Sequence, residues 1–265
     1  MLIEWLAYGA LGAFAGFLAG LLGVGGGLII VPVLTFIFTA HHFPGAYVVH
    51  LALGTSLASI VFTSISSFRA HHAHGAVNWR IWRQITPGII TGTLAGSVLA
   101  AWLSTAFLKA FFVVFLFYVG TQMLLDIRPK ASRALPGRPG MFAAGNVIGA
   151  VSSLVGIGGG TLSVPFMTWC NVRLHEAIGT SSAIGFPIAV AGAVGYVANG
   201  LRVGGLPDGS LGFVYLPALG AIAVASVLTA PLGARLAHRL PVKKLKKIFA
   251  LLLYTLGARM AWTLF

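Results

Sequence analysis

Two glycine clusters are the residues of this sequence best suited to binding a ligand. The segments 21–32 and 154–165, LLGVGGGLIIVP and LVGIGGGTLSVP, share four glycines and a proline at the same places. Each lies in a long apolar run, where clustered glycines weaken a helix. A helix that restarts after such a break presents unpaired N–H groups and the positive end of its dipole, which together bind anions. The residues assigned to this predicted anion site are Gly25, Gly26, Gly27, Gly158, Gly159, Gly160 and Thr161.

Glycines in a membrane helix also have a structural explanation, because they let two helices approach closely. A single cluster would favour that explanation. Two interrupted segments at corresponding places of a repeat instead favour a binding site, as in transporters built from repeats.

A Gly-Thr-Ser motif follows each glycine cluster and supplies hydroxyl side chains. Gly54-Thr55-Ser56 in the first half corresponds to Gly179-Thr180-Ser181 in the second. Hydroxyl groups can donate to an oxyanion without the desolvation cost of a buried charge, so we assign Thr55, Ser56, Thr180 and Ser181 to the same site. The alternative is that these hydroxyls bond to their own helix backbone.

Histidines and a carboxylate also occur at repeated positions. His50 corresponds to His175, which Glu176 follows, and His74 corresponds to Asn199. These residues are candidates for gating or for carrying a coupling proton. The alternative for His50, His175 and Glu176 is a helix-start residue at the membrane interface. No metal site and no cofactor are predicted, because the histidine pairs and clusters lack the other ligands that zinc needs.

The composition indicates helices that cross a membrane. The chain is 58% hydrophobic and only 8% charged, whereas soluble domains carry about 25% charged residues. Apolar runs of helical length recur, and the strand-length alternation of a barrel is missing. The net charge of +13 comes from Lys and Arg in short loops, which indicates membrane topology rather than nucleic-acid binding. The expected helical segments are 2–22, 27–40, 48–68, 81–103, 107–125, 141–155, 160–171, 178–198, 213–236 and 246–264.

The sequence predicts two membrane repeats, residues 1–125 and 141–265, joined by a basic linker at 126–140. With the linker inside the cell, all of the Lys and Arg residues except Lys109, Arg202 and Arg259 lie on the cytoplasmic side. This distribution favours inverted repeats, with both termini outside. The two segments flanking each glycine cluster form a hairpin that either crosses the membrane fully or is re-entrant, since about 12 apolar residues follow the glycines and a full span takes about 20.

The paired glycine motifs, each followed by Gly-Thr-Ser, resemble the sulfite exporter TauE/SafE family of bacterial membrane permeases. The resemblance extends over essentially the whole chain. It implies a transporter of sulfur-containing anions such as sulfite, sulfoacetate or related organosulfonates, and it places the glycines and the Thr-Ser pairs of the two halves in two half-sites.

We therefore expect an all-α inner-membrane protein that moves a small sulfur oxyanion or organosulfonate by alternating access, with export as the leading direction. A passive anion channel and a membrane enzyme acting on a lipid or sulfur compound are the alternatives. An enzyme is not expected, because no acid–base pair, metal set or activated nucleophile recurs near the membrane centre. The exact substrate, the coupling ion and the oligomeric state, a homo-oligomer included, stay open.

Overall fold

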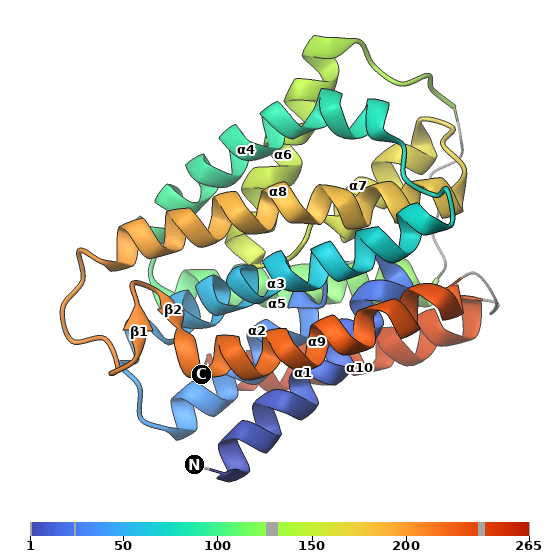
Figure 1. The fold of residues 1–265 in the computed structure, drawn as a ribbon. Coiled ribbons are helices and arrows are strands. Elements are labelled where there is room, and N and C mark those ends of the chain that lie inside the picture. The colour runs from blue at the N-terminus through green and yellow to red at the C-terminus, as the bar shows by residue number, and fades with distance from the viewer. Residues whose placement is uncertain (1, 24, 126–131, 238–241, 265) are drawn as a thin grey trace.

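The computed structural model describes the chain except residues 1, 24, 126–131, 238–241 and 265 (Figure 1). Most of it is helical, and the two strands of the described part are two residues long. The elements are α1 (Leu2–Leu22), α2 (Gly27–Ala40), α3 (Val48–Ala73), α4 (Trp79–Trp102), α5 (Thr105–Leu124), α6 (Arg138–Val155), α7 (Gly160–Trp169), α8 (Leu174–Gly200), β1 (Ser210–Leu211), β2 (Val214–Tyr215), α9 (Leu216–Ala237) and α10 (Val242–Trp262).

Six of the described helices are long and apolar enough to cross a membrane: α1 from Glu4, α3, α4, α5, α8 and α9. Large apolar side chains on the outer helices are exposed, among them Val114, Leu228 and Leu251. Lipid is the environment in which exposed apolar side chains and internally bonded helices are both favourable. The protein is thus an all-α, multi-pass membrane protein, as the composition predicts.

The helix boundaries follow local signals in the sequence. The side chain of Asn78 accepts from the amides of Arg80 and Ile81 and caps the start of α4, and Ser104 caps α5 in the same way. Several expected segments are longer than predicted: α3 continues to Ala73 and α8 begins at Leu174. Helix α6 begins at Arg138, inside the stretch predicted as the linker.

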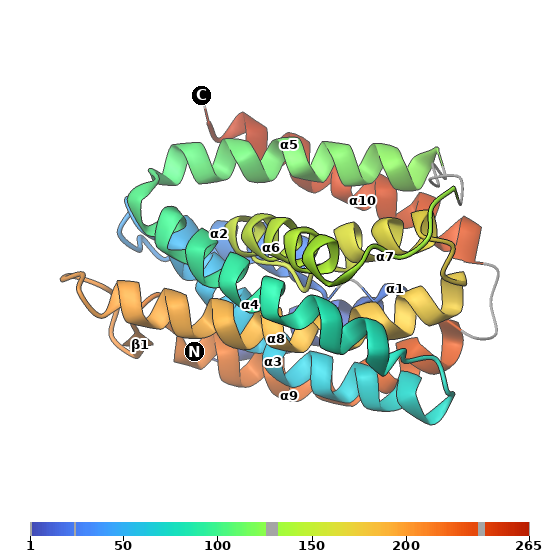
Figure 2. The same cartoon turned by 90° about the horizontal axis from the view of Figure 1, so that it is seen from above.

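Helices α3 and α8 lie side by side at the centre of the bundle (Figure 1). Helix α1 packs against α9 on one side, and α6 packs against α4 on the other. Helices α5 and α10 pack together along one face (Figure 2). The first helix of each half (α1 or α6) therefore packs against the fourth helix of the other half (α9 or α4).

Glycines permit the close packing of α1 against α9 and of α4 against α6. A Cβ atom added at Gly20 of α1 would overlap the carbonyl of Ala230 on α9, and one at Gly92 of α4 would overlap the carbonyl of Asn146 on α6. Backbones that touch without side chains between them gain van der Waals contact, the main attraction between helices in lipid.

The bundle has two ends, which we name by their loops. The linker end contains the α3–α4 turn, residues 132–137 and the α7–α8 turn. The hairpin end contains the α2–α3 loop, the α4–α5 turn and the β1–β2 hairpin. Helix α1 begins and helix α10 ends at this end of the bundle (Figure 1).

Candidate substrate-binding site

Each glycine cluster lies between the end of one helix and the start of the next. Helix α1 ends at Leu22 and α2 begins at Gly27, while α6 ends at Val155 and α7 begins at Gly160. Gly25 and Gly26 have φ of 81° and 79°, and Gly159 has φ of 75°. This left-handed backbone is favourable for glycine and strained for other residues.

The two breaks contact one another inside the protein. A Cβ added at Gly25 would lie 2.9 Å from the Cα of Gly158, and one added at Gly27 would overlap the carbonyl oxygen of Gly156. The breaks of the two halves therefore pack backbone against backbone. No larger residue fits at this contact without moving them apart.

The short helices α2 and α7 both begin at this contact. In α2 the first helical bonds are donated by Ile29 and Ile30 to the carbonyl of Gly26, and in α7 Leu162 and Ser163 donate to Gly159. The capping residues are glycines and contribute no side-chain cap. The positive ends of two helix dipoles thus converge on one place.

Ser56 and Ser181 connect each half to the break of the other. The Ser56 hydroxyl donates to the carbonyl of Gly156 at 2.7 Å, and the Ser181 hydroxyl donates to the carbonyl of Gly23 at 3.1 Å. Both carbonyls lie just past the end of a helix, where no further turn supplies a partner. In this structure the two serines clamp the breaks in position.

Thr55 and Thr180 form a second pair of reciprocal contacts. The Thr55 hydroxyl accepts from the amide of Tyr215 at 2.9 Å, and the Thr180 hydroxyl accepts from the amide of Asn78 at 2.8 Å. Each threonine thereby holds the residue that leads into the fourth helix of the other half. The four hydroxyls of the two Gly-Thr-Ser motifs therefore all make contacts between the halves here.

Thr161 differs from these residues. Its side chain is buried, and its hydroxyl makes no hydrogen bond. Its neighbour Ser163 donates to Ser181 at 2.9 Å and extends the clamp of the second half.

A small cavity of about 10 Å³ lies at the meeting of the two breaks. That volume accommodates about one water molecule. Its walls come from both halves, and these residues, all in the described part of the chain, are uncharged: Ala19, Gly23, Gly25, Thr63, Ser64, Ser67, Gly158, Ser182 and Gly185.

The sequence reasoning missed three of the cavity's hydroxyl residues, Thr63, Ser64 and Ser67. A signal exists for Thr63 and Ser67, because polar residues recur along α3 at intervals of three or four, at positions 56, 59, 63, 67 and 71. Ser64 lies outside this series. All of these side chains are buried. A buried polar stripe on a membrane helix indicates a face turned toward protein or a cavity.

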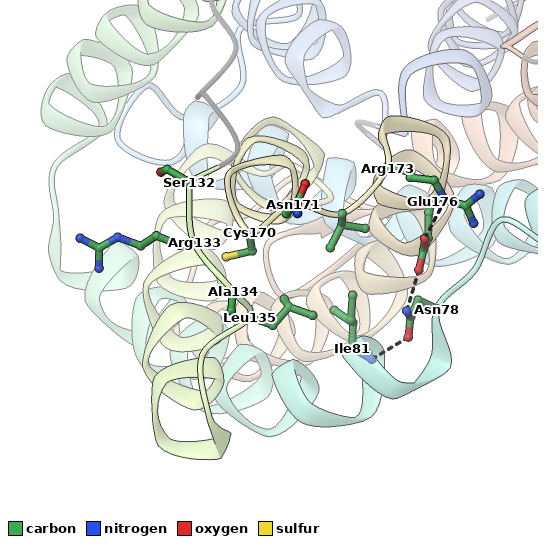
Figure 3. A pocket seen from close by; sticks show the side chains of 11 residues that line it. Asn78, Ile81, Ser132, Arg133, Ala134, Leu135, Cys170, Asn171, Arg173 and Glu176 are labelled. Atoms are coloured by element: carbon green, nitrogen blue, oxygen red, sulfur yellow. Dashed lines mark hydrogen bonds and ion pairs between the residues drawn. The ribbon is translucent and has the colours of Figure 1, made fainter.

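A larger pocket of about 660 Å³ opens at the linker end (Figure 3). On one wall the carboxylate of Glu176 accepts from the side-chain amide of Asn78 at 2.6 Å and lies 3.6 Å from the guanidinium of Arg173. Cys170 and Arg133 lie on the other side. The linker end of the bundle therefore has an open pocket.

Aromatic side chains pack together at the hairpin end. The ring of Phe213 lies 5.1 Å from His50 and 5.7 Å from Tyr47, measured between centroids, and Phe213 is only 2% exposed. Tyr215 packs edge-on against Phe38 and Phe43 at 5.5 and 5.1 Å.

Similar contacts are made at the two ends of the bundle. Gly54 abuts the carbonyl of Phe213, just as Gly179 abuts the carbonyl of Ala76. Tyr215 bonds to Thr55 as Asn78 bonds to Thr180. Phe213 and Tyr215 thus contact Gly54 and Thr55 in the way that Ala76 and Asn78 contact Gly179 and Thr180.

The candidate gating residues do not gather at the breaks. His50 is buried, with Nε2 3.0 Å from the carbonyl of Ala100, whereas its counterpart His175 is exposed. His74 is exposed and lies 2.7 Å from the carbonyl of Ala70 on its own helix, and Asn199 donates to Gly195 on its own helix. Within the described residues no group of three or more His, Cys, Asp or Glu side chains could hold a metal ion.

Similarity to known proteins extends over the whole bundle. A protein of Haemophilus influenzae named "Probable membrane transporter protein" is 36% identical over 250 residues, covering 94% of this chain and 95% of its own. A "Probable membrane transporter protein" of Methanocaldococcus jannaschii is 27% identical over 93% of this chain and 91% of its own. One of Bacillus subtilis is 29% identical over 72% of this chain and 77% of its own. No solved structure matches. The model of the family described as "Sulfite exporter TauE/SafE" matches residues 8–260, and the chain with its two abutting glycine breaks belongs to this family of membrane transporters.

Proposed function

We propose that this membrane transporter exports a small sulfur-containing anion, such as sulfite or an organosulfonate, and binds it between the two glycine breaks. The observation that carries the proposal is the contact of Gly25 with Gly158, where two helix N-termini and a hydroxyl-lined cavity meet. Helix N-termini favour negative charge and offer free amides. Interrupted helices at corresponding places of two repeats are the usual location of a transporter's substrate site.

The uncharged lining suits transport as well as binding. Amides and hydroxyls hold an oxyanion without a fixed positive charge, so the release of the anion does not require breaking a buried ion pair. The clamps of Ser56 and Ser181 position the breaks, and the amides and the cavity hydroxyls would contact the anion.

Alternating access between the two ends is the mechanism that this arrangement supports. A pocket is open at the linker end, while the rings of Phe213 and Tyr215 pack against other aromatic rings at the hairpin end. The reciprocal contacts of the halves suit a pseudo-twofold exchange in which one end closes as the other opens. The described conformation would then be the state open toward the linker.

We place the protein in the inner membrane, with the linker end in the cytoplasm and both termini outside. The support is the charge distribution, because most Lys and Arg residues belong to loops of the linker end under this arrangement. Inverted repeats follow from the same placement.

Flux measurements on purified protein in liposomes test the proposed function. We expect saturable sulfite transport that an imposed ion gradient drives uphill, and slower transport of a carboxylate of similar size. Parallel assays with sulfate, thiosulfate and sulfoacetate define the substrate. Purely downhill flux would indicate a channel, a chemically altered product would indicate an enzyme, and no saturable flux of any sulfur anion would refute the proposal.

A further inference from the structure

The hydroxyl of Ser67 has no hydrogen-bond partner although the side chain is only 2% exposed. Ser67 belongs to α3 and lines the cavity at the two glycine breaks. An unpaired polar group is costly in a buried site, and such a group in a native structure indicates a missing water or ligand. The position of Ser67 beside both breaks makes the transported anion a candidate for that partner.

Two further cavity hydroxyls make hydrogen bonds that they can give up in favour of a ligand. Ser64 donates to the carbonyl of Val61 at 3.0 Å, and Ser182 donates to the carbonyl of Gly179 at 2.7 Å. Each acceptor belongs to the serine's own helix, where the helix supplies a backbone N–H partner as well. Turning either hydroxyl toward a ligand therefore leaves no carbonyl without a partner.

The clamping serines lack this freedom. Ser56 and Ser181 donate to carbonyls beyond helix ends, at Gly156 and Gly23. If either hydroxyl turned toward a ligand, it would leave a buried carbonyl unpaired. Binding a ligand would thus cost Ser56 and Ser181 the hydrogen bond to a buried carbonyl that has no other partner, whereas Ser64, Ser67 and Ser182 would bear no such cost.

We propose that Ser67, together with Ser64 and Ser182, supplies the hydroxyl donors that contact the transported anion. This inference rests on the proposed function and assigns its ligand contacts. Sulfite and the sulfonate head group each present three oxygen acceptors, which matches three hydroxyls drawn from α3 and α8. A carboxylate has only two oxygens and cannot offer a separate oxygen to each hydroxyl, so we expect the set to favour sulfur oxyanions. Because the cavity volume of about 10 Å³ is too small for the anion in this conformation, the anion enters as the breaks separate.

Ser67→Ala tests the inference, with Ser66→Ala as the matched control. Ser66 is the neighbouring residue, but its hydroxyl donates to the carbonyl of Val227 on α9 and not into the cavity. We expect Ser67→Ala to raise the KM for sulfite transport about tenfold, the usual effect of losing one hydrogen bond to a charged ligand. Ser66→Ala should stay within about twofold of the unmodified protein.

Ser182→Ala provides a second test from the other half, and it decides the matter if Ser67→Ala does not fold. We expect it to raise the KM for sulfite severalfold at unchanged thermal stability, because the hydroxyl bonds only to its own helix. Equal KM values for the cavity variant and Ser66→Ala would overturn the inference and leave a structural water as the partner of Ser67. Absence of sulfur-anion transport by the unmodified protein would instead refute the proposed function, and this inference with it.

Discussion

Replacing Gly25 with alanine should separate the two breaks and strongly reduce transport. The substitution has two costs in this structure. The first is backbone strain, because Gly25 has φ of 81° and an L residue there costs about 1–2 kcal/mol. The second is the contact, because the new Cβ would lie 2.9 Å from the Cα of Gly158. Overpacking of this kind typically costs about 1–3 kcal/mol.

Gly75→Ala is the matched control for strain without contact. Gly75 has φ of 67°, and nothing lies within 4 Å of a Cβ added there. It should therefore lose only about 1–2 kcal/mol of stability, whereas Gly25→Ala should lose about 2–5 kcal/mol in total.

The two variants are compared by thermal unfolding in detergent and by sulfite flux in liposomes. We expect Gly75→Ala to keep most of its transport and Gly25→Ala to lose at least about tenfold, since a 1 Å misplacement of binding groups costs about that much or more. Equal stability and equal flux in the two variants would refute the reasoning that the breaks must touch.

Three further predictions follow from the clamps, the hairpin end and the linker-end pocket. Ser56→Ala or Ser181→Ala should lower the free energy of unfolding by about 1–3 kcal/mol, because a buried carbonyl loses its partner; unchanged melting of both variants in detergent would contradict their role as clamps. Phe213→Ala should open the hairpin end, so that liposomes lose trapped sulfite down its gradient faster than with the unmodified protein; release at the same rate or slower argues against Phe213 as a gate. Burial raises the pKa of the Cys170 thiol and the charge of Arg133 opposes this, so the thiolate forms only at higher pH than in an exposed cysteine. The rate of maleimide labelling should rise late in a pH series, and Arg133→Ala should move that rise to still higher pH; a move to lower pH would contradict this electrostatic effect.

Much of the fold can be predicted from the sequence because it depends on local signals. Long apolar runs fix the spanning helices, and clustered glycines fix the breaks after Leu22 and Val155. The β1–β2 hairpin was not predicted, because two-residue strands have too few side chains to show an alternating pattern. It matters to function, since it carries Phe213 to the hairpin end.

The roles of the hydroxyl residues are less accessible to sequence reasoning because they depend on partners from the other half. Thr55 and Ser56 stand out by their repetition, yet their contacts are to Tyr215 and Gly156, far along the chain. Ser67 is not repeated as part of a motif and looks like an ordinary helix serine. Only the packing of α3 against the breaks identifies it as a buried hydroxyl without a partner.

An experimental structure of the protein with bound sulfite would test the central claim most directly. We expect density for the anion between Gly25 and Gly158, within hydrogen-bonding distance of the amides that begin α2 or α7 and of the Ser67 hydroxyl. Sulfite bound away from the breaks, with Gly25 and Gly158 still in contact, would contradict it.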